Sequence, residues 1–200
     1  MTATAGSLSA TDGVRAVELA RNAVETFVEN DKREQLGSMR DAFYARTGAF
    51  VRLESTRGRG RLRGCAGTYD DSEHLGRAIV DAAIAAAGED SCGSSVDAAE
   101  LGNLRVSLCI VDSVVLTDDP LADLEIGRHG VAVEKGDRGG WLYPTVPVEN
   151  DWSAAECLDR VCRTADLPAG AWEDDAMVTL FEGRVFRERE PNGSVAELDL

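Results

Sequence analysis

The spacing of hydrophobic residues predicts helices and strands in the first half of the chain. Apolar residues recur at every third or fourth position in segment 12–30, which predicts a helix that Asp12 can cap. Segment 49–54 alternates apolar and polar residues as a strand does, and a turn rich in glycine and arginine leads from it to a second extended stretch, 61–67. These two stretches predict a β-hairpin. The alanine-rich segment 72–86 predicts a helix that packs closely on a sheet.

The second half of the chain continues this mixture of elements. Strands are predicted at 104–111, 131–133, 141–143 and 177–187, and a helix is predicted from Ser153 to a point before Pro168. Because strands and helices do not alternate strictly, the pattern favours an α+β fold with a mainly antiparallel sheet flanked by helices. The sequence shows neither an internal repeat nor an interdomain linker. We therefore predict one domain over residues 12–188, with flexible tails at 1–11 and 189–200.

The stretch Arg61–Thr68, with the sequence RLRGCAGT, is the candidate functional segment. Glycines inside a strand pattern mark a bulge or the close approach of a ligand or another backbone. Since side chains alternate along a strand, Arg61, Arg63 and Cys65 are predicted to share one face. Nearby guanidinium groups favour a thiolate, which makes Cys65 a candidate nucleophile. In the alternative interpretation, Cys65 is a small core residue and the arginines pair with carboxylates elsewhere.

Acidic residues greatly outnumber basic ones, and this narrows the classes of partner. The chain has 21 Lys and Arg residues against 36 Asp and Glu residues, which gives a net charge of −15. Such a surplus of carboxylates is typical of proteins that stay hydrated in strong salt. It also opposes binding to phosphate backbones, so we do not expect a nucleic-acid partner.

The same charge surplus predicts that the protein is stabilised by salt. Dissolved ions screen the repulsion between carboxylates, so we expect the melting temperature to rise between low-salt buffer and molar KCl. Thermal unfolding followed at a series of KCl concentrations measures this dependence. A melting temperature that stays constant across the series would contradict the prediction.

Cysteine and histidine positions give no sign of a metal site or of disulfides. The five cysteines are odd in number and include no Cys-x-x-Cys pair, and the start of the chain does not resemble a signal peptide. We therefore predict reduced thiols and a cytoplasmic location. His74 and His129 are isolated in the sequence, so neither a metal nor another cofactor is expected. No apolar run reaches the ~18 residues of a membrane-spanning helix, and no membrane association is expected.

Four segments resemble the AMMECR domain family, which is named after the AMME chromosomal region. Leu62–Thr68 (LRGCAGT) closely matches the family signature Leu-Arg-Gly-Cys-Ile-Gly-Thr. Further matches follow in the family's order at Glu100-Leu101, at Ile126–Val131 (IGRHGV) and at Pro144–Trp152, where the pattern is Pro-x-Val-x-x-Glu-x-x-Trp. The similarity extends over residues 12–188, and the acidic composition indicates a haloarchaeal-type member.

The resemblance implies an α+β domain with a main sheet, a smaller lobe and a cleft lined by the signature strand. The biochemical activity of the family is not established. Some members are joined to, or encoded beside, Memo-like and radical-SAM proteins, which indicates a shared modification pathway. The chain departs from the family at Asp90–Ser95, where relatives carry a segment of the type Asp-Pro-Arg-Phe-Pro-Pro. An arginine and an aromatic residue are thereby lost.

Two functions from different classes remain open. The first is an enzyme in which Cys65 is the nucleophile, Arg63 holds an anion and a histidine is the base. The resemblance favours His129 over His74 as that base, because His129 lies in a family motif. For each histidine the alternative is a hydrogen-bonded structural or surface group.

The second function is a binding or adaptor module that holds a small anionic ligand or a protein partner without chemistry. Glycines would let the ligand approach the backbone, and arginines would hold its charge. The candidate ligand-binding residues are Arg61, Arg63, Gly64, Gly67 and Thr68. The sequence does not indicate an oligomeric state.

Overall fold

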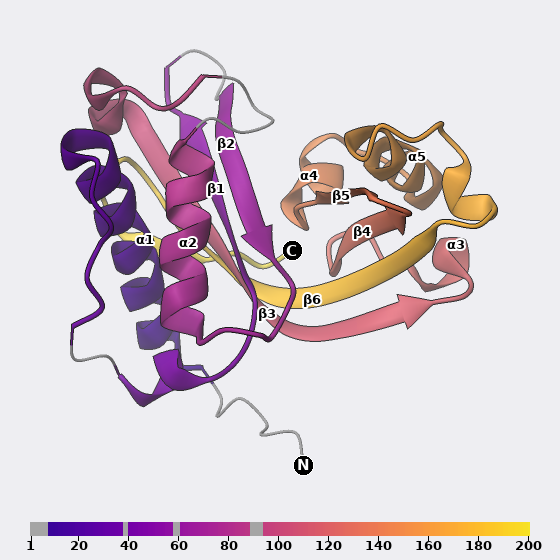
Figure 1. Ribbon diagram of the computed structural model, residues 1–200, viewed down its shortest axis with the longest axis horizontal. Coiled ribbons are helices and arrows are strands. Elements are labelled where there is room, and N and C mark those ends of the chain that lie inside the picture. The colour runs from indigo at the N-terminus through magenta and orange to yellow at the C-terminus, as the bar shows by residue number, and fades with distance from the viewer. Residues whose placement is uncertain (1–7, 38–39, 58–60, 89–93) are drawn as a thin grey trace. The chain divides into compact units, whose positions relative to one another are not determined.

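The computed structural model describes residues 8–37, 40–57, 61–88 and 94–200 and confirms the expected α+β fold (Figure 1). The chain divides into two compact units. The first comprises the chain up to Ile110 together with Arg184–Asp199, and the second comprises Val111–Gly183 with Leu200. None of the described helices is both long enough and apolar enough to cross a lipid bilayer.

Strands are arranged in the order β2-β1-β3-β6-β4-β5, and β7 also pairs with β6. The first unit contains α1 (Ala10–Asn30), η1 (Asp41–Tyr44), β1 (Ala49–Ser55), β2 (Arg61–Thr68), α2 (Leu75–Ala87), η2 (Ala98–Asn103) and β7 (Val195–Glu197). The second contains α3 (Pro120–Asp123), β4 (His129–Lys135), β5 (Arg138–Leu142), α4 (Thr145–Glu149), α5 (Ala154–Thr164) and η3 (Ala171–Glu173). Both units include part of β3 (Leu104–Thr117) and part of β6 (Met177–Glu188).

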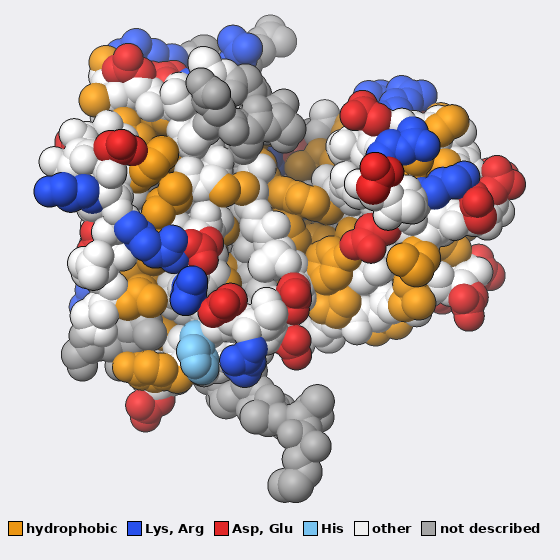
Figure 2. All heavy atoms as spheres, in the orientation of Figure 1, with side chains coloured by type: hydrophobic (Ala, Val, Ile, Leu, Met, Phe, Trp, Pro, Cys, Tyr) orange, Lys and Arg blue, Asp and Glu red, His pale blue; other side chains and the backbone are white. Residues whose placement is uncertain are grey.

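Helices α1 and α2 cover one face of the sheet in the first unit (Figure 1). Their apolar residues form a core with alternate residues of the strands, including Ala49, Val51 and Leu53 of β1 and Leu104, Val106, Leu108 and Ile110 of β3. The strand residues between these positions face away from the helices. Figure 2 shows acidic and basic side chains interspersed on the outward side of α1 and α2. One ion pair joins Arg33, just after α1, to Asp81 of α2.

Helix α1 begins earlier than the sequence pattern indicates. Its N-cap is Ser9, whose hydroxyl oxygen accepts the Asp12 backbone N–H at 3.2 Å, while the Asp12 carboxylate accepts the Ser9 N–H at 3.0 Å. The hydrogen bond from the Ser9 hydroxyl is the main cause of the lowered pKa of Asp12. Asp12 therefore completes a capping box instead of being the cap itself.

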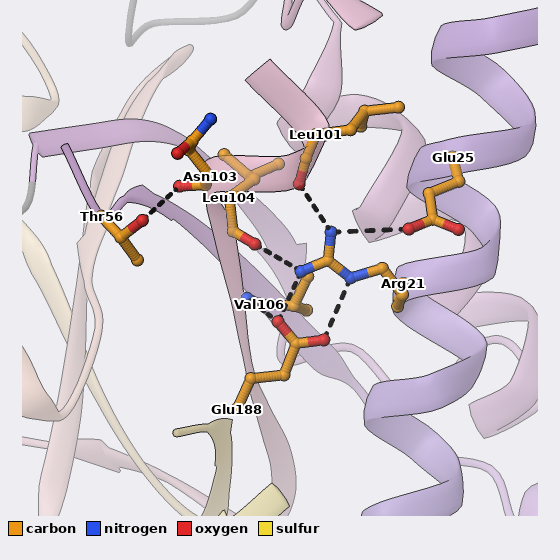
Figure 3. A network of polar contacts seen from close by, with 8 residues as sticks. All are labelled: Arg21, Glu25, Thr56, Leu101, Asn103, Leu104, Val106 and Glu188. Carbon is orange, nitrogen blue, oxygen red and sulfur yellow. Dashed lines mark hydrogen bonds and ion pairs between the residues drawn. The ribbon is translucent and has the colours of Figure 1, made fainter. Parts of the chain in front are cut away.

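A buried ion pair links Arg21 of α1 to Glu188 of β6, and both side chains also bind the backbone of β3 (Figure 3). The Arg21 guanidinium donates to the Glu188 carboxylate of β6 at 3.0 and 2.5 Å and to the carbonyl oxygen of Leu104 at 2.5 Å. Glu188 also accepts the backbone N–H of Val106 at 2.9 Å. Both charged side chains are about 95% buried, with 6% of Arg21 and 4% of Glu188 exposed.

The second unit has its own core beneath α5, which begins at its predicted position. Ser153 caps α5 and forms a capping box with Glu156. The Glu156 carboxylate accepts the Ser153 backbone N–H, and this hydrogen bond lowers the pKa of the Glu156 carboxyl. The apolar face of the helix packs on β4 and β6, with contributions from Val131, Val133, Cys157, Leu158, Val161, Cys162, Val178 and Leu180.

The predicted tail at 189–200 contains a strand. Residues Val195–Glu197 form β7, which pairs antiparallel with β6, and Glu197 forms an ion pair with Arg184 at 2.6 Å. Three residues are too few for alternation to be visible in the sequence. Strand β3 is also longer than predicted, because the pattern is interrupted at the polar residues Asp112 and Ser113 while the strand continues to Thr117.

Candidate functional site

The signature strand β2 forms the predicted hairpin with β1 and lies at the edge of the sheet. Their antiparallel register is interrupted once: Leu53 lies opposite Gly64, whereas the next residue, Glu54, lies opposite Leu62. Arg63 is therefore the extra residue of a β-bulge. Because a bulge breaks the alternation of side chains, the simple prediction that Arg63 and Cys65 share a face does not apply across it.

Neighbouring backbone atoms leave no room for a side chain at either signature glycine, Gly64 or Gly67. A Cβ atom at Gly64 would lie 1.7 Å from the carbonyl oxygen of Ala86 in α2, so the helix packs directly on the strand there. At Gly67 the backbone has a φ of 155°, and a Cβ atom would lie 2.3 Å from the carbonyl oxygen of Ala49. Of the two predicted reasons for glycine in this strand, close approach by another part of the chain accounts for both residues.

Cys65 lies on the sheet face opposite α1 and α2. In the strand register it is next to Arg52 of β1, and Arg52 is next to Ser107 of β3. Cys65 is partly exposed, whereas Arg52 and Ser107 are buried. We call this row of three residues, together with Glu54 and Arg105, the arginine–thiol face.

Guanidinium groups gather around one carboxylate on the arginine–thiol face. Glu54 forms ion pairs with Arg52 at 2.8 Å, with Arg105 at 2.6 Å and with Arg187 of β6 at 3.8 Å. The Glu54 side chain is only 7% exposed. Among the described residues, the buried Nε of Arg105 has no hydrogen-bond partner. Positive charge is thus concentrated beside Cys65 in an otherwise acidic protein.

The two arginines singled out in the signature strand have different surroundings. Arg63 donates to both carboxylate oxygens of Glu100, from Nε at 2.7 Å and from Nη2 at 2.8 Å, and this hydrogen bonding lowers the pKa of Glu100. Glu100 also accepts the backbone N–H of Asp97, the N-cap of η2, at 3.0 Å and so completes a capping box. Arg61 is exposed at the start of β2. The expected pairing of an arginine with a carboxylate elsewhere therefore holds for Arg63.

Gly67 and Thr68 line a small cavity of about 220 Å³ between the end of β2 and α2. The Thr68 hydroxyl oxygen accepts the Asp70 backbone N–H at 3.0 Å. Acidic side chains, Glu73 and Asp81, border the same cavity. Their charge is unsuited to the anionic ligand expected for these residues.

His129 belongs to the second unit, whereas Cys65 belongs to the first. Its Nδ1 accepts the Glu125 backbone N–H at 3.0 Å, and its Nε2 lies 3.6 Å from Oε1 of Glu182. The accepted hydrogen bond places the proton of the neutral ring on Nε2, on the side of the carboxylate. Arg128 binds the same carboxylate and lowers the pKa of Glu182. Pairing of His129 with Cys65 stays a prediction.

His74 is a hydrogen-bonded surface residue. It occupies the N-cap position of α2, and its Nδ1 lies 2.6 Å from the carbonyl oxygen of Tyr44. The two aromatic rings also meet edge to face, with 6.2 Å between their centres. These contacts match the surface alternative for this histidine.

Cys65 differs in exposure from the other described cysteines. Cys109, Cys157 and Cys162 are buried, and burial raises the pKa of the Cys157 thiol to about 11. Cys92 and most of the segment that departs from the family pattern lie outside the described residues. Within the part of the chain that the structure describes, Cys65 is therefore the cysteine most open to reagents.

Sequence reasoning missed Arg52 and Glu54, which contribute the central charges of the face. A signal was present, since segment 49–55 reads AFVRLES and places two opposite charges two positions apart in an apolar strand. Residues two apart share a face, so such a pair predicts a buried ion pair inside a sheet.

Comparison with known proteins identifies relatives along nearly the whole chain. The AMMECR1 family model matches residues 17–186. A protein of Halobacterium salinarum is 65% identical over 189 residues, which cover 90% of each chain, and one of Methanococcoides burtonii is 38% identical over 195 residues, covering 95% of this chain and 96% of the relative. The crystal structure of an uncharacterised protein from Pyrococcus horikoshii superposes with a TM-score of 0.84 at 31% identity, covering 94% of this chain and 97% of that one. These matches confirm the resemblance carried by the signature strand, and the chain belongs to the AMMECR1 family.

Proposed function

We propose that the arginine–thiol face binds an anionic group, such as a carboxylate or phosphate of a small ligand or of a protein partner. The observation that carries this proposal is the position of Arg52 beside the partly exposed Cys65, next to the arginines that gather around Glu54. Guanidinium groups donate the hydrogen bonds that carboxylates and phosphates accept. The buried Glu54 holds Arg52 in place, so little side-chain entropy remains to be lost when an anion binds.

The distribution of charge favours anion binding at one specific site over attraction of anions to the whole surface. The net charge of −15 repels anions from most of the surface. Around Glu54 of this face, Arg105 and the neighbouring Arg187 add to the positive charge of Arg52. An anion that binds there must therefore be selected by local hydrogen bonds.

A second candidate function is covalent catalysis by Cys65, favoured by the position of Arg52 directly across the strand pair. A neighbouring guanidinium stabilises the thiolate, which can attack an electrophilic carbon of a bound anionic substrate while the leaving group departs with its bonding electrons. The resemblance to proteins encoded beside Memo-like and radical-SAM proteins supports a role for either function in a modification pathway.

Alkylation of Cys65 by iodoacetamide, mapped by mass spectrometry at constant KCl, tests the proposal. We expect inorganic phosphate or pyrophosphate to slow labelling of Cys65 in the parent protein, because a bound anion lies over the thiol and weakens the field of Arg52. Arg52→Gln should slow labelling without phosphate by roughly 3- to 10-fold and should abolish the effect of phosphate. Arg61→Gln is the matched control and should behave like the parent, since Arg61 is exposed.

Two results would oppose the proposal. One is Cys65 labelling that neither anion changes, and the other is an Arg61→Gln variant that loses the phosphate effect as Arg52→Gln does. Circular dichroism establishes that each variant is folded. Calorimetric binding of pyrophosphate to Cys65→Ser tests the anion site apart from the thiol, because anion binding does not need the thiol whereas covalent catalysis needs both.

A further inference from the structure

The second half of β3 is an exposed sheet edge in the second unit. Strand β1 pairs with β3 only from Leu104 to Ile110, so within the described residues no strand covers that edge from Ser113 to Thr117. The other neighbour of β3 is β6. Backbone N–H and C=O groups on an uncovered edge can pair with an added strand.

Side chains on this edge are apolar and lack the usual protection. Val114, Val115 and Leu116 are 43%, 58% and 62% exposed, and Leu121 of α3 is 49% exposed. Natural edge strands are commonly protected by lysine, proline or a bulge, whereas the sequence from Ser113 to Thr117 contains no charge and no proline. Because Val115 points to the opposite side from its two neighbours, an added strand would find apolar contacts on both faces.

Acidic residues follow the apolar run. Asp118 and Asp119 are exposed directly after Thr117, and Asp123 of α3 accepts the Thr117 hydroxyl at 2.5 Å. These three carboxylates attract cations to one end of the exposed edge. The partner strand therefore needs apolar residues beside Val114–Leu116 and basic residues beside the aspartates.

We propose that this edge binds an extended segment of a partner protein, in which basic residues precede a β-branched apolar run. The pairs β1–β2, β1–β3, β4–β5 and β4–β6 are all antiparallel, and an antiparallel addition places the start of the partner segment beside Asp118. A second copy of this chain fits less well. Antiparallel pairing of two copies centred on Val115 sets Asp112 opposite Asp118 twice, and like charges directly opposite destabilise a strand pair.

Fluorescence polarisation with a labelled peptide tests the proposal. The probe carries two lysines followed by alternating valine and threonine, and a second peptide carries glutamates in place of the lysines. The lysine peptide should bind at least about 5-fold more tightly than the glutamate peptide, and Asp118→Lys should remove this preference. Val115→Lys should weaken binding about 10-fold or more, since it places a charge on the apolar edge. Val148→Lys is the matched control, because Val148 is an exposed valine on α4.

Several outcomes would overturn the proposal. Equal affinity for the lysine and glutamate peptides would show that the aspartates do not select the partner. Equal effects of Val115→Lys and Val148→Lys would show that the peptide does not bind at the β3 edge. A lysine peptide N-methylated on the pairing residues should not bind, and undiminished binding would exclude strand addition. Sedimentation that shows a dimer abolished by Val115→Lys would assign the edge to a second copy of the chain.

Discussion

Replacement of Arg21 by methionine is expected to lower the free energy of unfolding by about 3–5 kcal/mol, because it leaves the buried Glu188 carboxylate without its cation. The guanidinium also donates to the carbonyl oxygens of Leu101 and Leu104, which lose a donor in the variant. Urea unfolding in molar KCl, followed by circular dichroism, measures the change.

A matched control comes from the same helix. Arg15 of α1 pairs with Glu18, but 60% of the Arg15 side chain is exposed. Arg15→Met should therefore change the free energy of unfolding by less than about 1 kcal/mol. The double variant Arg21→Met/Glu188→Met should regain part of the loss, since it removes the buried charge altogether. Equal losses for Arg15→Met and Arg21→Met would show that burial of the pair has no energetic consequence.

Gly64→Val is expected to destabilise the first unit by about 3 kcal/mol or to prevent its folding. The added side chain would overlap the Ala86 carbonyl, so either α2 or β2 must move. Thermal unfolding measures the loss in soluble material. Gly102→Val is the control, because no atom lies within 4 Å of a Cβ placed at Gly102 and its φ does not favour glycine. A Gly64→Val variant that melts with the parent would show that the helix does not pack on the strand as described.

Local patterns were sufficient to predict the hairpin, the helix from Ser153 and the importance of the signature glycines. In each case a few adjacent residues carry the signal, either as periodicity or as glycine inside a strand. The reason for Gly64 was also among those expected, although its neighbour is the backbone of α2 and not a ligand.

The charges of the candidate site depend on contacts that local patterns do not contain. Arg63 was predicted to share a face of the strand with Cys65, but the bulge interrupts the alternation and Glu100, 37 residues away, binds its guanidinium. The arginines that surround Glu54 come from three strands, and their grouping follows from sheet order. Strand order is a tertiary property, so sequence spacing alone could not identify Arg52 as the neighbour of the thiol.

The division of the first unit between both ends of the chain has a consequence for its synthesis. The second unit lies within one continuous stretch, Val111–Gly183 apart from Leu200, so nearly all of it is synthesised before Glu188 is added. Arg21 is synthesised 167 residues before Glu188, so its charge stays hydrated until Glu188 has been added. The inserted unit is therefore made before this buried ion pair can form, and α1 gains its contact with Glu188 only after the whole of Val111–Gly183 has been synthesised.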